Sequence, residues 1–494
     1  PAAVRSQLAA VVGPDQIRDD RETRVRHCRG RSTVDLIRLR SGDGSDAPDA
    51  VVTPGGHDEV LAVLRVCADH GVAVVPFGGG TSVVGGLAPR RREGQPMIAL
   101  DLARLDRLVA VDEVSGTAVL QAGVRGPRAE TLLARHGLTL GHTPQSWEYA
   151  SIGGFAATRS SGQASSGYGR FDDLVTGLRV ATPVGTWELG RGPASAAGPD
   201  LRQLVLGSEG AFGVITEVAV RVRPMPTARR FEGWRVPDLA TGIDLLRTLA
   251  QRGLLPTVCR LSDELETAAG LANSRTAGTA TTLPDGEKEA GEPPAPLSAA
   301  GGCYLVTGYE GDEAAVRQRM GEVTEVLRAA GAASLGEQVG NEWVRGRFHA
   351  PYLRDALLDE GIFAETLETA ACWSDLPGLY AAVRDAITGA LAADGAAAVV
   401  MCHISHVYPV GASLYYTVVC PQGPEPLARW RAAKRAAGDA IMANGGTITH
   451  HHAVGTDHQP WLGAEIGDIG VAVLRAVKQA VDPAGILNPG VLVP

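Results

Sequence analysis

The chain has 494 residues, of which 45% are hydrophobic and 20% charged, and its formal net charge is −9. This length exceeds what one hydrophobic core usually organises, so we expect two domains. The composition is that of an ordinary globular protein. The negative charge argues against a general nucleic-acid binder, which needs a basic face.

The seven cysteines are scattered along the chain, and no two have the C-x-x-C spacing. This pattern favours a reduced cytoplasmic compartment over a disulfide framework or a zinc site. No run approaches the roughly 18 to 20 apolar residues of a membrane span. The amino terminus lacks the charged-then-apolar pattern of a signal peptide. We therefore expect a cytoplasmic protein.

Helix and strand signals alternate in the first part of the chain. Apolar residues recur at helical spacing over residues 57–67, and Gly71 ends this element. Short β-branched or apolar runs predict strands at 72–75 and 97–102. Two hairpins are expected, one joining residues 108–111 to 117–122 and one turning at 183–186.

The sequence Pro224-Met225-Pro226 interrupts regular secondary structure and predicts the point where the chain leaves the first domain. Helices are expected beyond it, at residues 239–252, 313–330, 376–393, 427–441 and 465–481. Residues 277–300 have almost no large apolar side chains and predict a mobile loop. No internal repeat is visible. We expect three segments, with residues 1–224, 225–424 and 425–494.

Three consecutive glycines follow the strand expected at 72–75. Glycine permits positive φ and close backbone approach, so successive N–H groups can converge on a pyrophosphate. Neither G-x-G-x-x-G nor a Walker motif occurs, which excludes a Rossmann loop or a P-loop. A surface turn is the alternative. The run is Pro76, Phe77, Gly78, Gly79, Gly80, Thr81 and Ser82, and Gly85-Gly86 follows it.

Two further clusters of glycines and hydroxyl residues favour a pyrophosphate-binding loop over a surface turn. One runs from Gly141 to Gly162, and the other is the sequence G-S-E-G-A-F-G-V-I-T from Gly207 to Thr216. Three such loops in one α/β region suit an extended dinucleotide with many polar groups. We therefore prefer a cofactor site to chance clustering.

These three motifs together resemble the FAD-binding domain of the vanillyl-alcohol oxidase superfamily, the PCMH-type domain. The resemblance covers residues 50–225 and returns in the last 70 residues. It implies an α+β fold, in which a two-subdomain FAD-binding domain is split in sequence and an α+β cap domain carries the substrate site.

The resemblance also implies which residues hold FAD. No histidine lies between Phe77 and Pro89, where some members attach the flavin covalently, so we expect non-covalent FAD. The cofactor-binding residues implied beyond the first glycine loop are His142, Gln145, Ser146, Ser151, Gly153, Gly154, Thr158, Arg159, Ser160, Ser161, Glu209, Gly210, Gly213, Val214 and Ile215.

The carboxyl-terminal third resembles bacterial alkyldihydroxyacetonephosphate synthase-like flavoproteins. The matching runs are Pro351–Asp355, Gly411–Tyr416 and Asn444–His452, and Cys259–Asp263 also has a counterpart. These proteins exchange the acyl chain of an acyl-dihydroxyacetone phosphate for a fatty alcohol, through an adduct at flavin N5, in ether-lipid synthesis.

Residue roles follow from this resemblance. Arg354 grips the substrate phosphate, a task suited to a planar charged fork. Tyr415 removes the α-proton, which a phenol can do only beside a cation or donor. His450, His451 and His452 supply that environment, and Arg260 also binds substrate. Arg354 could instead be a surface arginine, Tyr415 could be core, and one histidine of the run is expected to be structural.

One residue departs from the pattern. His403 stands in Cys402-His403-Ile404 where animal synthases have Cys-Arg-Val, which puts phosphate binding in doubt, because the charge of histidine is conditional near neutral pH. His403 and His406 invite a metal interpretation. In an extended strand this pair faces opposite sides, so we expect no metal.

Three functions compete. The first is the redox-neutral synthase reaction, and the second is an FAD-dependent oxidase or dehydrogenase of an α-hydroxy acid or related alcohol using the same Tyr415–histidine site. The third is a flavin-binding protein with a decayed site. We expect a small or lipid-like substrate, a homodimer, transient contact with a membrane surface and no nucleic-acid partner.

Overall fold

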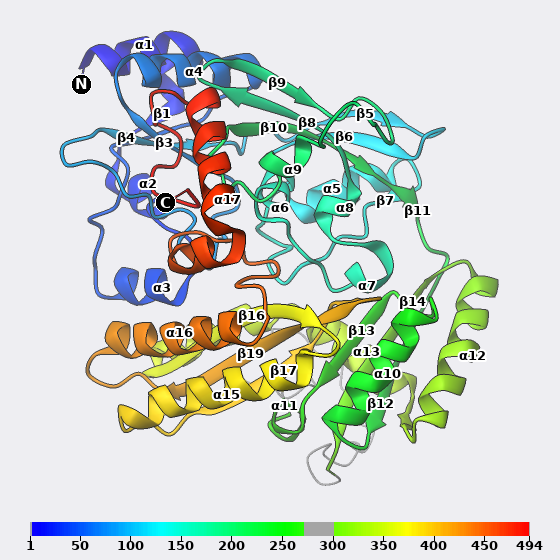
Figure 1. Cartoon of the computed structure of the whole chain (residues 1–494). Coiled ribbons are helices and arrows are strands. Elements are labelled where there is room, and N and C mark those ends of the chain that lie inside the picture. Colours follow the sequence, from blue (N-terminus) through cyan, green and yellow to red (C-terminus); the bar gives the residue numbers. More distant parts are fainter. Residues whose placement is uncertain (1, 271–300, 494) are drawn as a thin grey trace, which may run out of the picture. The chain divides into compact units, whose positions relative to one another are not determined.

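A computed structural model describes residues 2–270 and 301–493, so the loop predicted at 277–300 lies outside the described residues. The chain forms two compact units with the α+β fold expected from the sequence (Figure 1). Unit 1 comprises Pro1–Gly162, Gly169–Met225 and Ile448–Pro494. Unit 2 comprises Gln163–Tyr168 and Pro226–Thr447.

Unit 1 contains a four-stranded sheet of order β1-β2-β4-β3, in which β2, β4 and β3 are parallel. Helix α4 (His57–Asp69) supplies the crossover that parallel strands require, and it buries Val60, Val63, Leu64 and Cys67. The predicted helix and strands are therefore confirmed. The strands are β1 (Ile17–Arg18), β2 (Ala50–Val52), β3 (Ala73–Phe77) and β4 (Met97–Asp101).

A second sheet of unit 1 is antiparallel and five-stranded, with order β5-β6-β10-β8-β9. Both predicted hairpins occur in it, as β5–β6 and β8–β9. One hydrophobic core is continuous between the two sheets. The strands are β5 (Leu108–Asp112), β6 (Thr117–Gln121), β8 (Val175–Thr182), β9 (Gly185–Leu189) and β10 (Val214–Arg221), and β7 (Leu138–Thr139) pairs separately with β11 (Arg223–Pro224).

The remaining helices of unit 1 are short except at its two ends. They are α1 (Ala2–Val12), α2 (Arg21–Arg26), α3 (Thr33–Arg40), α5 (Gly126–Ala134), α6 (Ile152–Thr158), α8 (Phe171–Leu174), α9 (Arg202–Val205) and α17 (Gln459–Val481), with a 3-10 turn at Pro14–Gln16. Helix α17 begins six residues before the start expected from the sequence, because Pro460 suits a first helical turn. It bends at Gly467, where φ is 72°.

The chain's end returns to the first sheet. Val74 of β3 forms a parallel bridge with Leu487. The Val74 N–H donates to the Ile486 carbonyl at 2.8 Å, and the Asn488 N–H donates to the Val74 carbonyl at 2.8 Å. Residues from opposite ends of the sequence therefore complete the edge of the sheet from which the first glycine loop departs.

Unit 2 is built on one antiparallel sheet of order β15-β12-β14-β13-β17-β19-β16, with β18 paired to β19. Its strands are β12 (Ala228–Val236), β13 (Val258–Ser262), β14 (Cys303–Gly311), β15 (Ala333–Leu335), β16 (Ile362–Cys372), β17 (Val399–Ile404), β18 (Val407–Tyr408) and β19 (Gly411–Pro421). Its helices are α7 (Ser165–Tyr168), α10 (Leu239–Gln251), α11 (Glu264–Ala268), α12 (Glu313–Ala329), α13 (Gly336–Gly346), α14 (Ala350–Asp359), α15 (Leu376–Ala393) and α16 (Pro426–Ala443).

The topology of unit 2 repeats although its sequence does not. The first half runs β12-α10-β13-β14-α12-β15 and has strand order β15-β12-β14-β13. The second half runs β16-α15-β17-β19-α16 and ends where Thr447 forms a bridge with Ala370 of β16. The halves join through β13 and β17, where Ser262 pairs with His403. The two halves of unit 2 therefore share one folding pattern.

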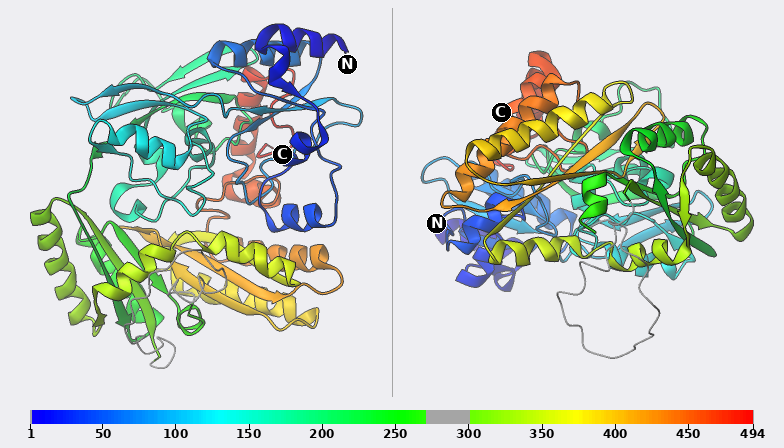
Figure 2. Two further views of the ribbon diagram at one scale, coloured as in Figure 1. Left: turned by 180° about the vertical axis from the view of Figure 1, so that it is seen from behind. Right: turned by 90° about the horizontal axis from the view of Figure 1, so that it is seen from below.

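The two faces of this sheet carry different helices. Helices α15 and α16 pack side by side on one face of the second half, and α13 and α14 lie on the opposite face (Figures 1 and 2). Tyr416 faces α15, because its hydroxyl lies 3.4 Å from the Leu379 carbonyl. Tyr415, the next residue, faces the other way.

The boundaries of the units differ from the three segments expected from the sequence. Helix α16 packs against α15 and lies in unit 2, so unit 1 resumes at Ile448 rather than at residue 425. The short segment Gln163–Tyr168 also belongs to unit 2, and its Ala164 packs in the core with Phe231. Helical periodicity alone could not indicate which unit a helix joins.

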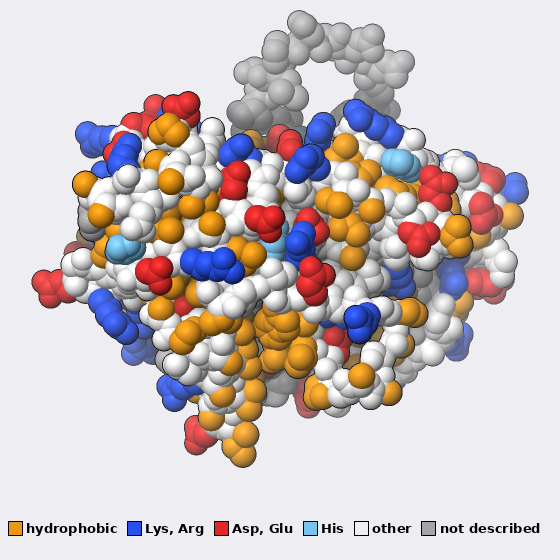
Figure 3. Space-filling model, turned by 90° about the horizontal axis from the view of Figure 1, so that it is seen from above, with side chains coloured by type: hydrophobic (Ala, Val, Ile, Leu, Met, Phe, Trp, Pro, Cys, Tyr) orange, Lys and Arg blue, Asp and Glu red, His pale blue; other side chains and the backbone are white. Residues whose placement is uncertain are grey.

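Within the described residues, no helix is long and apolar enough to cross a membrane. On the face drawn in Figure 3, acidic and basic side chains are interspersed, and the described residues form no continuous basic field there.

Candidate active site

The first glycine loop of unit 1 is shaped by close backbone contacts. A Cβ atom on Gly78 would lie 2.4 Å from Ser151 Oγ, and one on Gly79 would lie 2.2 Å from the Tyr149 carbonyl oxygen. Gly80 has a φ of +68°. Backbone atoms crowd Gly79, and the φ of Gly80 is positive, so these two positions require glycine, and the loop lies directly against the second cluster.

The third cluster meets the other two. A Cβ on Gly210 would lie 2.8 Å from Cγ of Pro76. The N–H groups of Gly207 and Glu209 donate to the carbonyls of Ala156 and Ala157 at 3.0 and 2.9 Å. The three loops, which lie up to 140 residues apart, therefore converge at one place in unit 1.

Glu209 is buried at this convergence and has a φ of 50°. Its Oε2 accepts hydrogen bonds from the N–H groups of Val454 and Gly455 at 3.1 and 2.7 Å. Burial raises the pKa of Glu209 to about 7, against the effect of these bonds. Asn488 donates to the carbonyls of Gly86 and Glu209 at 2.9 and 2.7 Å. The sequence did not indicate Asn488, because it lies far from the glycine motifs.

Several buried polar atoms around these loops have no hydrogen-bond partner among the described residues. They are His142 Nδ1, Ser161 Oγ, Ser208 Oγ, Glu209 Oε1 and Asn488 Oδ1. Proteins rarely leave buried polar atoms unsatisfied, so such a group points to a polar ligand. Together with glycines that leave room for close approach, these atoms fit FAD.

His142 lies among aromatic rings. Its ring centroid is 4.8 Å from that of Phe155 and 5.0 Å from that of Phe171, and its Nε2 lies 3.1 Å from Ser160 Oγ. Burial lowers the pKa of His142 to about 3. The imidazole is therefore neutral, and its role toward a flavin stays a prediction.

Arg159 uses its guanidinium within the protein. Its Nε and Nη2 donate to the carbonyls of Leu206 and Gln203 at 3.0 and 2.9 Å, and its Nη1 lies 3.2 Å from Asp172. The side chain thus ties the second loop to the third. This arrangement makes Arg159 a support for the loops.

The other predicted cofactor residues have varied settings. Ser151 caps α6 by accepting from the Gly154 N–H at 3.2 Å, and the Thr158 hydroxyl donates to the Gly154 carbonyl at 2.9 Å. Gly153 packs against Ala122. Ser82 accepts from the Gly86 N–H, Gln145 is exposed, Thr81 and Ser146 are half-buried, and Gly213 leads into the buried Val214 and Ile215 of β10.

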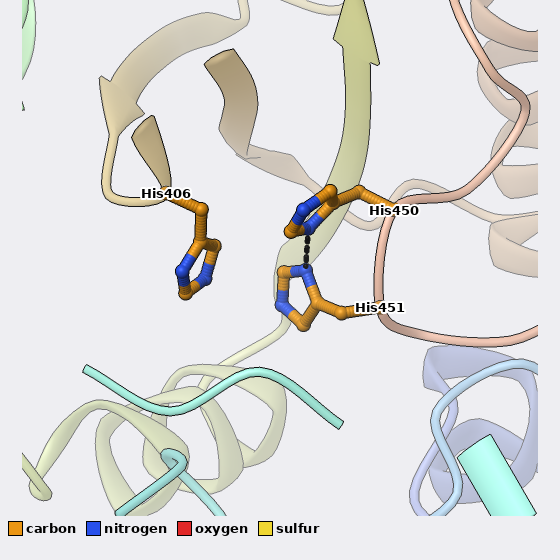
Figure 4. A group of neighbouring side chains, drawn as sticks. All are labelled: His406, His450 and His451. Atoms are coloured by element: carbon orange, nitrogen blue, oxygen red, sulfur yellow. Dashed lines mark hydrogen bonds between the residues drawn. The ribbon is translucent and has the colours of Figure 1, made fainter. Parts of the chain in front are cut away.

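The histidine run belongs to unit 1. The Nδ1 atoms of His450 and His451 are 3.0 Å apart. Figure 4 marks this hydrogen bond with a dashed line, and His406, also labelled there, belongs to unit 2. One nitrogen must donate and the other accept, so the pair shares a proton. The ring centroids of His451 and His452 are 4.7 Å apart.

Arg170 supports the histidine run and was not predicted. Its Nη1 donates to the His450 carbonyl at 3.2 Å, and it forms two further bonds of 2.9 Å to Asp172. Asp172 also binds Arg159, so one carboxylate connects the second loop to the histidine run. Only the fold reveals this link.

Tyr415 lies on the polar face of the second half of unit 2. It pairs with Glu368 of β16 and with His403 of β17, whose ring stacks on it at 4.8 Å and 19°. Burial raises the pKa of Tyr415 to about 12, while a hydrogen bond with Thr366 and the charge of Arg354 act in the opposite direction. The phenol is therefore protonated at neutral pH, with a cation near enough to ease its ionisation.

Arg354 lies on α14, and its buried Nε has no hydrogen-bond partner among the described residues. A guanidinium with a free donor can bind an anionic oxygen. The structure thus leaves Arg354 available for the role expected of it.

Arg260 and His403 are joined by a carboxylate that the sequence did not indicate. Oε1 of Glu266, on α11, lies 2.9 Å from Arg260 Nη2 and 3.1 Å from His403 Nδ1. Burial by itself raises the pKa of Glu266, but Arg260 and His403 outweigh burial and hold it well below its usual range. Burial and the charge of Arg260 lower the pKa of His403. The group therefore holds one cation, one anion and a neutral imidazole.

The predicted site residues thus fall into two groups. The flavin loops and the histidine run lie in unit 1, and Arg260, Arg354, His403 and Tyr415 lie in unit 2. The glycine loops could be found by their composition. Glu266 and Arg170 could not be found in this way, because charged residues are common in any sequence. Only the folded structure brings these two residues next to their partners.

Comparison with known proteins identifies the family. Residues 48–189 match the FAD binding domain, and residues 225–492 match the FAD linked oxidases, C-terminal domain. An alkyldihydroxyacetonephosphate synthase of Trypanosoma brucei brucei is 35% identical, covering 99% of this chain and 80% of the relative. That of Dictyostelium discoideum is 33% identical, covering 100% and 81%.

A solved structure of an alkyldihydroxyacetonephosphate synthase superposes with a TM-score of 0.82 at 29% identity, covering 99% of this chain and 86% of that one. The similarity extends over both units rather than over the flavin loops alone. The chain therefore belongs to the FAD-linked oxidase family and is a flavin enzyme similar to alkyldihydroxyacetonephosphate synthases over its whole length.

Proposed function

We propose that this chain exchanges the acyl chain of an acyl-dihydroxyacetone phosphate for a fatty alcohol, as a cytoplasmic bacterial enzyme of ether-lipid synthesis. The observation that carries the proposal is Tyr415, which stands on the polar face of the sheet with the charge of Arg354 acting on it. The relatives' names and the full-length similarity support the same reaction.

The reaction is redox-neutral overall. The bond between the substrate carbon and the acyl oxygen breaks, the acyl chain leaves as a fatty acid, and the oxygen of the fatty alcohol forms the new ether bond. Bound FAD supplies the electrophilic ring system for this exchange, held by the three glycine loops and the buried polar atoms around them.

The protein's own residues bind the substrate and move protons. The Arg354 guanidinium binds the phosphate. The charge of Arg354 favours ionisation of the Tyr415 hydroxyl, and the resulting phenolate oxygen takes the α-proton and later returns it. His450 and His451 share one proton between adjacent nitrogens, which suits a proton relay.

The proposed FAD is bound non-covalently. His27 lies beside Phe77 of the first loop, with ring centroids 4.5 Å apart, but both its nitrogens are engaged by the Thr23 carbonyl and Asp101. A histidine so held is poorly placed to form a flavin bond. Precipitation with acid should release all yellow colour into the supernatant, whereas colour kept in the pellet would contradict the proposal.

The reaction itself is tested by mixing the FAD-loaded protein with an acylated dihydroxyacetone phosphate and a labelled fatty alcohol. Release of fatty acid and transfer of the label to an ether are expected. The second candidate is an α-hydroxy-acid dehydrogenase, since a D-lactate dehydrogenase of Arabidopsis thaliana is 25% identical over 100% of this chain. Anaerobic bleaching of the flavin by a hydroxy acid, without label transfer, would select it.

We also propose that the protein is a homodimer and that it contacts membrane surfaces transiently, where a lipid-like substrate would be found. Light scattering after gel filtration measures the oligomeric state, and co-sedimentation with vesicles measures membrane binding. A monomer, or protein left entirely in the supernatant, would contradict the corresponding part of the proposal.

A further inference from the structure

The group formed by Arg260, Glu266 and His403 is rigidly built. Glu266 is held by its backbone, because its N–H donates to Asp263 Oδ1 at 2.7 Å. Asp263 Oδ2 also accepts from the Cys402 N–H at 2.9 Å, next to His403. One buried carboxylate thus fixes both the helix that carries Glu266 and the strand that carries His403.

The charges within the group cancel. Arg260 donates to Glu266 Oε1 and to Ser262 Oγ at 2.9 and 2.8 Å. His403 is neutral because of burial and the nearby guanidinium. The second oxygen of Glu266, Oε2, is buried and has no hydrogen-bond partner among the described residues. The carboxylate therefore neutralises Arg260 and keeps one free acceptor.

The contrast with Arg354 is the basis of the inference. The buried Nε of Arg354 has no hydrogen-bond partner among the described residues. Arg260 has a carboxylate at 2.9 Å, and an added anion beside it would be repelled by that charge. Two arginines that look equivalent in the sequence thus differ in what they can bind.

We propose that Glu266 is a specificity-determining residue, which turns the Arg260–His403 region into a neutral subsite for a hydroxyl or carbonyl group and leaves the substrate's phosphate to Arg354. This inference deepens the proposed function and rests on it for the identity of the substrate. The substitution Glu266→Gln removes the negative charge and keeps the shape of the side chain. The positive charge of Arg260 is then no longer compensated.

Binding of inorganic phosphate to the FAD-loaded protein tests the proposal without turnover. Calorimetric titration should give a Kd about tenfold lower for Glu266→Gln than for the unsubstituted protein, equal to about 1.4 kcal/mol. Adding Arg260→Gln to that variant should abolish the gain. Glu264→Gln, on the same helix but exposed, should leave the Kd unchanged. A merely structural role of Glu266 would not increase affinity, so an equal or higher Kd overturns the proposal.

The double variant Glu266→Gln/Arg260→Gln removes both charges and provides a second measurement should Glu266→Gln alone fail to fold. Its phosphate affinity should differ from that of the unsubstituted protein by less than about twofold, because the net charge of the pair is unchanged. A loss of tenfold or more would show that Arg260 binds the anion and would overturn the proposal.

Kinetics extend the test to the reaction. Glu266→Gln should lower KM about tenfold for the phosphate-bearing substrate and leave KM unchanged for the same ketone ester lacking phosphate. An equal change for both substrates contradicts the proposal. If no exchange occurs with any variant, the proposed function fails, while the phosphate titration still decides the role of Glu266.

Discussion

The two halves of the unit 2 sheet share one topology and use the same face differently. In the first half, Phe231, Tyr304 and Val306 form an apolar cluster with Val339 and Trp343 of α13. In the second half, the corresponding face presents Tyr415, Glu368 and His403. A single folding pattern thus provides one half with an apolar packing face and one half with a polar face that holds candidate site residues.

The difference lies in side chains rather than in backbone. Both halves pair their strands in the same order, and they meet where Ser262 opposes His403. The polar residues Arg260 and Glu266 lie at this junction, at the edge of the apolar half. A change of a few side chains is therefore enough to convert a packing face into a candidate catalytic face.

The largest effect is expected from Tyr415→Phe. Loss of the hydroxyl should lower the turnover rate about 100- to 10,000-fold, the usual contribution of general acid–base catalysis. Its neighbour Tyr416 faces α15 and bonds to carbonyls there, so Tyr416→Phe is a matched control. The control should cost about 1 kcal/mol of stability and retain activity. Comparable activity losses in Tyr415→Phe and Tyr416→Phe would contradict the conclusion that only the face with Tyr415 takes part in catalysis.

Truncation in the apolar half should act on stability. Trp343 is buried against Phe231, with ring centroids 6.4 Å apart. Trp343→Ala should reduce the free energy of unfolding by about 3 to 5 kcal/mol, measured by urea denaturation. Trp343→Phe should cost much less, because most of the apolar contact remains. A stable Trp343→Ala protein that has lost activity would contradict the structural role.

Arg354→Lys tests the anion site of the second half. Lysine keeps the charge but not the planar fork, so KM for the phosphate-bearing substrate should rise about 10- to 100-fold, the loss of a charged hydrogen bond. Steady-state kinetics separate this rise in KM from a change in kcat. An unchanged KM would show that the phosphate binds elsewhere.

The junction between the halves should be sensitive to pH. Burial raises the pKa of Asp263 to about 6 from an ordinary value near 3.8. The folded protein therefore binds this proton more tightly than the unfolded chain does, so its contribution to stability is fully present below pH 3.8 and is lost as the pH rises through about 6.

Substitution isolates this contribution. Asp263→Asn should remove the fall in stability between about pH 4 and 6. It should cost about 1 to 3 kcal/mol at pH 7, because an amide oxygen that accepts from the Cys402 N–H and Tyr380 leaves the NH2 group facing the N–H donor of Glu266. Thermal unfolding across this pH range measures both effects. A pH slope that persists in the variant would assign it to another group.

Local patterns predicted the elements and the flavin loops. Helix α4, both hairpins and the glycine run at Gly78–Gly80 depend on periodicity and on backbone freedom, which neighbouring residues determine. Tyr415 was ambiguous, because a strand of apolar residues can bury either face. Only the pairing with His403 settles which side it faces.

The supporting residues could not be predicted, because their partners are distant in sequence. Arg170 reaches the His450 carbonyl 280 residues away, and Asn488 reaches the Gly86 carbonyl 402 residues away. Glu266 gains its significance from His403, 137 residues later. The repeat in unit 2 was also missed, because it is a repeat of topology with different side chains.

The return of the chain's end to β3 has a consequence for biosynthesis. Val74 can pair with Leu487, and the carbonyl of Gly86 can accept from Asn488, only after residues 487 and 488 have left the ribosome. Unit 2 ends at Thr447, so it is translated before residues 487 and 488 and can fold before unit 1 is complete. The candidate cofactor loops of unit 1 therefore gain these contacts only after residues 487 and 488 have been synthesised.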